Sequence, residues 1–574
     1  MINRCLRGLA VALLAGVLTP AWGHPPVEPT LDAHTQEFEK RVYKVTDGVY
    51  QAVGYAIANS IMIEGDDGII IVDVTESLES AQEVMAEFRK ITDKPVKALI
   101  YTHNHADHVF GARGFVPEGD VDVYAHETTN YYLNRVGNII ANSLQIRSSR
   151  MFGTYLPQGE EGVVNTGLGP FLAVTGPNGG TVAPIRPNKT FSDELDIEIA
   201  GVKIKLVHAP GETNDQLFVW LPEKKVLMPG DNLYKAFPNL YTIRGTLYRD
   251  VLGWVDSLDK MLAVEPAFIA PSHSRPIVGK AKAKEVLTAY RDAIQYVHDQ
   301  TVRGINQGLT PDELVEIVKL PSHLKNHPYL AEHYGTVAWS VRMIYQGYLG
   351  WFNGDATSLN PVGPLDRARK TVSLMGGEEK VEQSIREALA DAEWAWAAEL
   401  AAHLERVAAD RTDASALKAE ALRNLGQLSV SANGRNYYLT QALETENKLA
   451  ITPEDVDENR LDFVKTLPMV DLLKSMPVNL NPEKAADVDQ RVELNFTDSG
   501  ESFHFHVRNG VAVLREGKAD GDVDLRVELT ANGWVEMITG HQSLPKALLT
   551  GDIKLENRIT DVPAFLGFLN LFAG

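Results

Sequence analysis

Residues 101–115 are Tyr-Thr-His-Asn-His-Ala-Asp-His-Val-Phe-Gly-Ala-Arg-Gly-Phe, and they follow a short, mostly apolar run at residues 96–100. The apolar run predicts a buried strand, which places the polar stretch on the loop that leaves that strand. Within six positions the loop offers three imidazoles and one carboxylate: His103, His105, Asp107 and His108. Catalytic zinc prefers these ligand types. His103 and His105 can point to one side of the loop and Asp107 and His108 to the other, which suits two metal ions. The alternative is a polar loop that is merely rich in histidine.

The order of these residues, Thr-His-x-His-x-Asp-His, resembles the metal loop of the metallo-β-lactamase superfamily. The resemblance implies an αββα sandwich that holds two metal ions at the edge of its sheets. It also implies that further ligands follow later strands. Asp73 comes directly after an apolar run at residues 69–72. It would support the metal loop from behind the ligands, or it is a turn residue at the end of a strand.

Three later segments fit the implied ligand order, because each carries a ligand-type residue after a predicted strand. The strands are predicted at residues 202–207, 225–228 and 268–270, and the residues that follow them are Glu212, Asp231 and His273. The resemblance implies that Asp231 bridges the two metal positions. The implied ligands that complete the first position are His103, His105 and Glu212. The implied ligands that complete the second position are Asp107, His108 and His273.

Length and charge limit the class of protein. The chain has 574 residues, more than one hydrophobic core usually serves, so about two to four domains are expected. Its 44% hydrophobic and 23% charged residues are ordinary for a globular protein. The net charge of −21 argues against nucleic acid or an anionic membrane as the main partner. An anionic substrate would need local positive charge, which metal ions and a few arginines supply.

Residues 1–23 are predicted to be a secretory signal peptide. Arg4 and Arg7 precede an apolar run at residues 9–18 that is too short to span a bilayer, and small residues follow at a cleavage position. We therefore expect a periplasmic or secreted protein without a membrane anchor after cleavage. The one cysteine of the chain, Cys5, lies inside this segment. The mature protein would then contain neither disulfides nor thiolate zinc sites.

Two further segments resemble the linear alkylsulfatase family: residues 239–245, with Arg249 shortly after, and residues 150–157. The resemblance implies that a sulfate ester is the substrate. A sulfate monoester carries one negative charge over three oxygens, which cationic and hydrogen-bonding side chains can hold beside the metals. The implied catalytic and substrate-binding residues are Asp107, Tyr155, Arg244 and Arg249. The alternative for the two arginines is an ordinary surface ion pair.

The chain also departs from that family at several positions. Asp231 stands where the bridging ligand is usually glutamate, and Gly-Glu-Thr-Asn at residues 211–214 replaces the usual Thr-Glu-Ala-Pro. Lys235 and Pro238 replace histidines that are common after the bridging residue. These changes leave open a binuclear metallohydrolase of another ester, such as a phosphoester or a lactone. A non-catalytic lipid carrier is a third possibility.

Residues 24–280 are predicted to be the catalytic domain and residues 281–450 a helical domain. Within the second, Thr310, Pro311 and Glu313 have the spacing of a capping box at the start of a helix. Residues 378–443 are rich in Ala, Leu and Glu, which favours stacked helical hairpins. These stretches resemble the dimerisation domain of alkylsulfatases, which implies a homodimer. The alternative is a helical-repeat scaffold without a fixed partner.

Residues 454–574 are predicted to be a third domain, in which polarity alternates along several segments. Residues 492–496, 503–507 and 523–529 show this pattern, and Asn509-Gly510 predicts a hairpin turn. We expect a small antiparallel sheet with one buried face and helices over it. The pattern resembles a sterol-carrier-type domain, which implies an apolar groove for an alkyl chain.

The sequence therefore predicts a multidomain α/β protein. Its parts are an αββα metallo-β-lactamase sandwich, an all-α helical domain and an α+β sterol-carrier-like domain. The predicted function is zinc-dependent hydrolysis of a small, amphiphilic alkyl sulfate ester to an alcohol and sulfate by a metal-bound hydroxide. Two Zn²⁺ ions per chain and a homodimer are expected.

Overall fold

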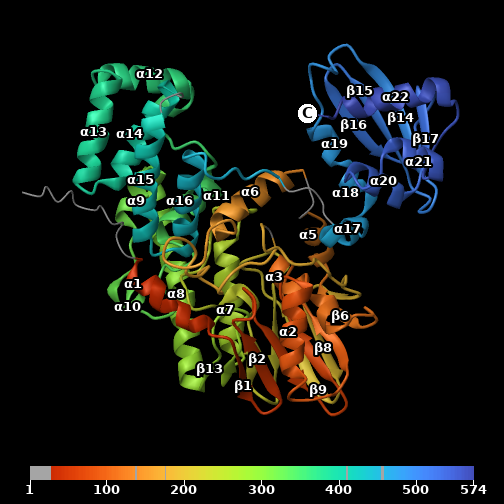
Figure 1. The fold of residues 1–574 in the computed structure, drawn as a ribbon. Coiled ribbons are helices and arrows are strands. Elements are labelled where there is room, and N and C mark those ends of the chain that lie inside the picture. The colour runs from red at the N-terminus through yellow and green to blue at the C-terminus, as the bar shows by residue number, and fades with distance from the viewer. Residues whose placement is uncertain (1–26, 136–138, 175, 409–411, 454–457, 574) are drawn as a thin grey trace, which may run out of the picture.

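The computed structural model describes residues 27–135, 139–174, 176–408, 412–453 and 458–573. In the view of Figure 1 the sandwich of strands lies at the bottom, helices α12–α14 lie at the upper left and the C-terminal domain lies at the upper right. The predicted signal peptide and Cys5 fall outside the described residues. Within the described part of the chain, no helix is both long and apolar enough to cross a membrane.

The first sheet has seven strands in chain order, antiparallel from β1 to β4 and parallel from β4 to β7. Its strands are β1 (Arg41–Thr46), β2 (Val49–Val53), β3 (Ser60–Glu64), β4 (Ile69–Val72), β5 (Val96–Ile100), β6 (Asp122–His126) and β7 (Lys189–Phe191). All four residues of β4 are buried. A strand buried on both faces is expected where one face meets a second sheet and the other meets helices.

The second sheet has six strands in the order β13-β12-β11-β10-β9-β8. Its strands are β8 (Glu194–Ile199), β9 (Val202–His208), β10 (Leu217–Leu221), β11 (Val226–Met228), β12 (Phe268–Ile269) and β13 (Ile277–Val278). The two sheets share one apolar cluster, to which Ile61, Ile70 and Val72 of the first sheet and Leu206 and Val219 of the second contribute. The sheets therefore pack face to face around a common core.

Helices cover the outer faces of both sheets. Helix α2 (Leu78–Phe88) buries Val84 and Phe88 in the same cluster as β4 and β5. Ser77 caps this helix by accepting a hydrogen bond from the Ser80 amide. On the other side α7 (Val251–Ala263) buries Trp254 against the second sheet. The αββα sandwich and the fold class predicted from the sequence are confirmed.

The remaining helices of residues 27–279 lie before the first strand or between strands. They are α1 (Pro29–His34), η1 (Thr35–Phe38), α3 (Ala106–Val109), α4 (Ala112–Phe115), α5 (Thr129–Arg135), α6 (Ala141–Phe152) and η2 (Gly230–Asn232).

The helical part follows the sandwich. Its elements are α8 (Lys280–Ile305), α9 (Pro311–Ile317), α10 (Ser322–Lys325), α11 (Val337–Leu349), η3 (Ala356–Ser358), α12 (Pro364–Leu374), α13 (Glu378–Ala390), α14 (Trp394–Val407), α15 (Thr412–Leu428) and α16 (Ala432–Thr445). Helices α8 to α11 share an apolar core with the sandwich, whereas α12 to α15 have an apolar cluster of their own. The capping box predicted at Thr310 and Glu313 is confirmed. Tyr290 of α8 and Ile344 of α11 share one apolar cluster with Trp254 of the sandwich. The domain boundary predicted at residue 280 stays a prediction. The apolar cluster that contains Trp254 and Tyr290 includes residues on both sides of it.

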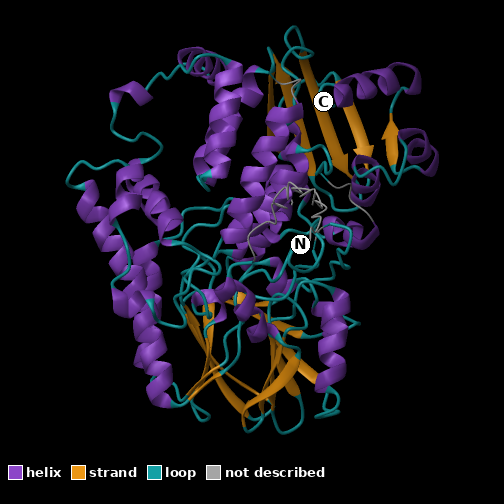
Figure 2. Ribbon diagram, turned by 60° about the vertical axis from the view of Figure 1, so that its left-hand side comes forward, coloured by secondary structure: helices purple, strands orange, loops and turns teal. Residues whose placement is uncertain are grey.

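The C-terminal domain forms its own sheet, separate from the sandwich strands in Figure 2. Its elements are α17 (Glu458–Lys465), α18 (Met469–Leu473), α19 (Ser475–Val478), β14 (Asp489–Phe496), β15 (Ser502–Arg508), β16 (Val511–Glu516), β17 (Leu525–Leu529), α20 (Ala531–Ile538), α21 (Leu544–Thr550), β18 (Ile553–Leu555) and α22 (Arg558–Asn570). One face of the sheet is buried: Phe505 of β15 packs with Trp534 of α20 and Phe568 of α22.

Two features of this sheet bear on the sequence predictions. The hairpin turn between β15 and β16 is confirmed, with φ of +48° at Asn509 and +76° at Gly510. These values are those of a two-residue hairpin turn, which asparagine and glycine adopt most readily. The prediction of a purely antiparallel sheet is wrong for one pair of strands, because β14 and β17 run parallel. The segment that joins β17 to the sheet crosses over, and strand alternation in the sequence does not reveal the direction of pairing.

The C-terminal domain contacts the sandwich near the predicted metal loop. The rings of Phe110 and Phe463 lie 5.2 Å apart. Arg460 Nη2 also donates a hydrogen bond to the carbonyl of Val174 at 2.7 Å. Phe110 lies two residues after His108, so α17 packs directly behind the loop that carries the predicted ligands.

Replacing a buried leucine of β5 tests whether this strand anchors the loop. Leu99→Ala removes a fully buried side chain from the core, and we expect the free energy of unfolding to fall by about 2–5 kcal/mol. Val278→Ala, at 61% exposure in β13, is the control and should cost less than about 0.5 kcal/mol. Urea unfolding of both variants checks this. Equal midpoints for the two would contradict the burial of Leu99.

Candidate active site

The predicted ligands come from loops at the ends of four strands, and the sandwich brings these ends together at one edge. The loops follow β5, β9, β11 and β12. The side chains form two groups with atoms close enough to hold a metal ion. The first group, at the first predicted metal position, is His103, His105 and Asp231. The second group, at the second predicted position, is Asp107, His108, Asp231 and His273. Asp231 belongs to both groups, as expected of a bridging ligand.

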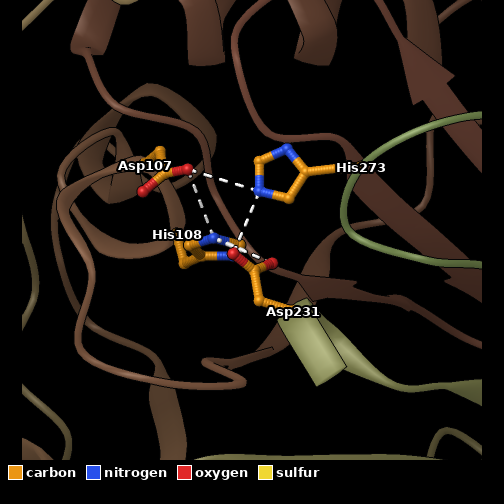
Figure 3. A group of neighbouring side chains, drawn as sticks. All are labelled: Asp107, His108, Asp231 and His273. Atoms are coloured by element: carbon orange, nitrogen blue, oxygen red, sulfur yellow. Dashed lines mark hydrogen bonds and ion pairs between the residues drawn. The ribbon is translucent and has the colours of Figure 1, made fainter. Parts of the chain in front are cut away.

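Figure 3 shows the side chains of the second group pointing toward one another. His108 Nε2 lies 3.4 Å from Asp107 Oδ2 and 3.4 Å from Asp231 Oδ1. His273 Nε2 lies 3.5 Å from Asp107 Oδ2 and 3.1 Å from Asp231 Oδ2. Two imidazole nitrogens and two carboxylates thus converge from three loops, which matches the nitrogen and oxygen donors that zinc accepts.

The first group is arranged around His103. His103 Nε2 lies 3.0 Å from His105 Nδ1 and 3.8 Å from Asp231 Oδ2. Glu212, the third predicted ligand of this position, lies outside the two groups but beside Asp231. Burial raises the pKa of Glu212, Arg249 lowers it, and the neighbouring Asp231 carboxylate raises it further. Glu212 Oε1 accepts a hydrogen bond from Arg249 Nη1 at 2.6 Å. Glu212 Oε2 has no hydrogen-bond partner among the described residues, so it is the oxygen available to a metal ion.

Buried atoms without partners show that the site fits divalent metal ions. His108 Nε2, Glu212 Oε2 and Asp231 Oδ1 are buried and have no hydrogen-bond partner among the described residues. An unsatisfied buried polar atom costs stability. The three atoms belong to three different loops and lie in the two ligand groups or beside them. The donor set, the convergence and the unsatisfied atoms together agree with bound metal ions.

The charges in the second group shift one another's pKa. Burial raises the pKa of Asp107, but His108 and His273 lower it to about 2. Burial lowers the pKa of His273, but Asp231 and Asp107 raise it to about 8. Opposite charges in close contact favour the charged form of each partner. The metal-free site therefore behaves as a network of mutually dependent charges.

Asp73 holds the metal loop from behind the ligands. Its carboxylate accepts hydrogen bonds from the Thr102 amide and hydroxyl, both at 2.9 Å, and from the Ser272 hydroxyl at 2.7 Å. His108 Nδ1 lies 2.8 Å from Asp73 Oδ2, which leaves Nε2 for the metal. Of the two interpretations left open by the sequence, support of the metal loop agrees with these contacts.

Two arginines lie beside the ligands. Arg244 Nη2 is 3.2 Å from His105 Nε2. Arg249 is 3% exposed, and its Nη1 donates to Glu212 and to the carbonyl of Asn239. Its Nε and Nη2 are buried without a hydrogen-bond partner among the described residues. The interpretation of Arg249 as part of a surface ion pair is therefore wrong. Its ion pair with Glu212 is buried and leaves Nε and Nη2 without acceptors among the described residues.

Comparison with known proteins identifies the chain. Residues 53–273 match the metallo-beta-lactamase superfamily, residues 310–448 match alkyl sulfatase dimerisation, and residues 458–574 match the alkyl sulfatase C-terminal domain. The chain is 42% identical to a linear primary-alkylsulfatase of Pseudomonas sp. (strain ATCC 19151), over 88% of this chain and 97% of that protein. The chain belongs to the alkylsulfatase family of the metallo-β-lactamase superfamily.

Other alkylsulfatases agree with this assignment. An (R)-specific secondary-alkylsulfatase of Pseudomonas sp. is 28% identical, over 93% of this chain and 81% of its own length. Among solved structures, the stereoselective inverting sec-alkylsulfatase Pisa1 from Pseudomonas sp. superposes with a TM-score of 0.86 at 27% identity. The superposition covers 94% of this chain and 86% of that one. The match therefore includes the order and placement of all three parts of the alkylsulfatase fold.

A buried tyrosine near the alkylsulfatase site was not predicted from the sequence. Tyr334 is 6% exposed and lies in the loop between α10 and α11. Burial raises the pKa of its hydroxyl, the charge of Glu212 raises it further, and the charge of Arg244 lowers it. The sequence placed Tyr334 only within the predicted helical domain, residues 281–450. Tyr155 lies in the turn after α6, and its role in binding the substrate stays a prediction.

Glu76 is a second group that the sequence did not point to. It is fully buried and accepts hydrogen bonds from the amides of Ile57 and Ala173, at 3.3 Å each. The carbonyl of the same Ile57 lies 2.8 Å from His273 Nδ1. Glu76 thus fixes the segment that orients a predicted ligand. Burial raises the pKa of Glu76 to about 8, and the charge of Asp107 contributes.

The raised pKa of Glu76 predicts a pH dependence of stability. A carboxyl whose folded pKa of about 8 exceeds its unfolded value of 4.5 stabilises the fold fully below pH 4.5. That contribution is lost as the pH rises through 8. Glu76→Gln gives a side chain of nearly the same shape that stays neutral at every pH. The loss of Tm between pH 5 and pH 8.5 should therefore be smaller than in the unchanged metal-free protein. Equal losses of Tm in the two proteins would contradict a neutral Glu76.

Proposed function

We propose that the protein hydrolyses alkyl sulfate esters to an alcohol and inorganic sulfate with two zinc ions bound at its two ligand groups. The observation that carries this proposal is the position of Asp231, which is shared by both groups. A shared carboxylate suits two metal ions a few ångström apart, and such pairs stabilise both the attacking and the leaving oxygen of a displacement. Zinc, when bound, supplies Lewis acidity toward water and toward the ester.

The two arginines and Tyr334 supply the binding of the sulfate group. Arg244 reaches His105, and Arg249 keeps Nε and Nη2 unused beside Glu212. A guanidinium presents several donors in a fixed plane, which suits the oxygens of a sulfate group. The Tyr334 hydroxyl, which the charges of Glu212 and Arg244 affect, adds a donor that stays protonated because burial raises its pKa.

Asp107 has the catalytic role among the ligands in this proposal. Its side chain keeps 17% exposure, whereas those of His108 and His273 are fully buried and that of Asp231 keeps 4%. Among these four ligands, the Asp107 carboxylate is therefore the one that solvent reaches most easily. Because its pKa is lowered to about 2, it is ionised at neutral pH and can orient water by accepting a hydrogen bond.

The amphiphilic character of the substrate and the place of action complete the proposal. The match of residues 458–574 to the alkyl sulfatase C-terminal domain supports an alkyl sulfate ester, whose alkyl chain makes it amphiphilic. The dimerisation match at residues 310–448 supports a homodimer. The signal peptide expected at residues 1–23 supports a periplasmic or secreted enzyme.

Sulfate release is the first test of this function. We expect the mature protein, loaded with Zn²⁺, to release sulfate from dodecyl sulfate or from a secondary alkyl sulfate. Removal of the metal with a chelator should abolish release, and Zn²⁺ should restore it. Metal analysis should give two zinc ions per chain. Release of phosphate or opening of a lactone, without release of sulfate, would replace this proposal with the other binuclear hydrolase.

Arg244→Ala tests the assignment of the sulfate-binding side chains. We expect kcat/KM for dodecyl sulfate to fall by about 10²–10³-fold, because a donor to the developing negative charge is lost. Arg291→Ala is the control, since Arg291 pairs with Asp259 on the outer surface. Zinc content should be unchanged in both variants. An unchanged kcat/KM in Arg244→Ala would remove Arg244 from the substrate site.

A further inference from the structure

A buried carboxylate that is not a metal ligand lies between the two loops of the first metal position. Asp215 follows Glu212 by three residues and is fully buried. Its Oδ1 accepts a hydrogen bond from Asn104 Nδ2 at 2.6 Å, and its Oδ2 accepts one from the Thr129 hydroxyl at 2.8 Å. Both oxygens are therefore engaged, and Asp215 is in neither ligand group.

The partners of Asp215 place it where it can act on the ligands. Asn104 lies between His103 and His105, so a bond to its side chain fixes the part of the loop that carries both imidazoles. On the other side, Asp215 belongs to the loop that carries Glu212. One carboxylate thus joins the two loops that supply the first position.

Backbone and side-chain contacts repeat the same connection. The amide of Leu217 donates to the carbonyl of Thr102 at 2.9 Å, so the two loops are also joined at their base. Asn214 Nδ2 donates to the Tyr132 hydroxyl at 3.1 Å. Thr129 and Tyr132 both belong to α5, which is therefore docked on the Glu212 loop through two consecutive residues of that loop. Asp215 is the member that reaches both α5 and the metal loop.

We propose that Asp215 is a positioning residue that sets the separation of the His103–His105 loop from Glu212 and so preorganises the first metal position. This inference rests on the proposed function, because it requires a metal ion at that position. Partners of metal ligands orient the ligands, and their loss typically weakens metal binding by about 10–100-fold. A buried carboxylate without such a role would affect folding stability and leave metal affinity unchanged.

The test uses Co²⁺, whose visible absorption reports the coordination of each position in the full-length, metal-free protein. Three variants are compared with the unchanged chain: Asp215→Ala, Asp215→Asn, and the exchange Asn104→Asp with Asp215→Asn. The exchange keeps one amide and one carboxylate in contact with reversed direction, and it preserves the net charge. Glu493→Ala is the matched control. Glu493 is also a buried carboxylate, 2% exposed, and it accepts bonds from Ala519, Asn495 and Arg526 in the C-terminal domain.

We expect Asp215→Ala to bind Co²⁺ at the first metal position about 10–100-fold more weakly and to change the visible absorption of that ion. Binding of Co²⁺ at the second position should be affected less. The Co²⁺ affinity of Asp215→Asn should lie between those of Asp215→Ala and the unchanged chain. The exchange of Asn104 and Asp215 should recover most of the affinity. Glu493→Ala should lower Tm and leave Co²⁺ binding unchanged. Unchanged affinity in both single Asp215 variants would overturn the inference, and so would an equal loss in Glu493→Ala. Uptake of fewer than two Co²⁺ ions by the unchanged protein would instead overturn the proposed function, together with the position that Asp215 serves.

Discussion

The carboxylate of Asp73 joins three of the segments from which the site is built. It is fully buried directly after β4, and it receives hydrogen bonds from the start of the metal loop and from the loop after β12. His108 Nδ1 lies against the same carboxylate. Its backbone has φ of +57°, a strained value for a residue with a side chain. A chain adopts such a conformation where the surrounding contacts outweigh its cost, and here these contacts fix a ligand loop.

Much of the fold and of the ligand cluster could be predicted from the sequence, because short patterns encode both. An apolar strand that ends in a dense group of imidazoles and carboxylates is a local signal, and His103 to His108 give it within one loop. Glu212, Asp231 and His273 each follow a predicted strand, and the family resemblance implied that these strand ends carry the remaining ligands. The family resemblance supplied the order in which they combine, and the structure brings them to one place.

The remaining parts depend on contacts between segments that are far apart in the chain. Tyr334 belongs to a loop that the sequence places only within the predicted helical domain, although its hydroxyl is affected by the charges of Glu212 and Arg244. Glu76 acts through the backbone of Ile57. The parallel pairing of β14 with β17 has the same alternation as an antiparallel pair. Asp215 gives no signal at all in the sequence, since its partners Asn104 and Thr129 are ordinary polar residues until the fold places them beside it.

The continuous core between the sandwich and the helical part has a consequence for how this chain can be divided. Tyr290, Ile344 and Trp254 belong to one apolar cluster, and Tyr334, near the site, lies beyond α8. A fragment that stopped at residue 280 would expose the buried face of the sandwich and would lack that tyrosine. Domains that share a core do not separate as independent folding units. A chimera that keeps the core of this chain intact must therefore exchange the sandwich and helices α8–α11 together.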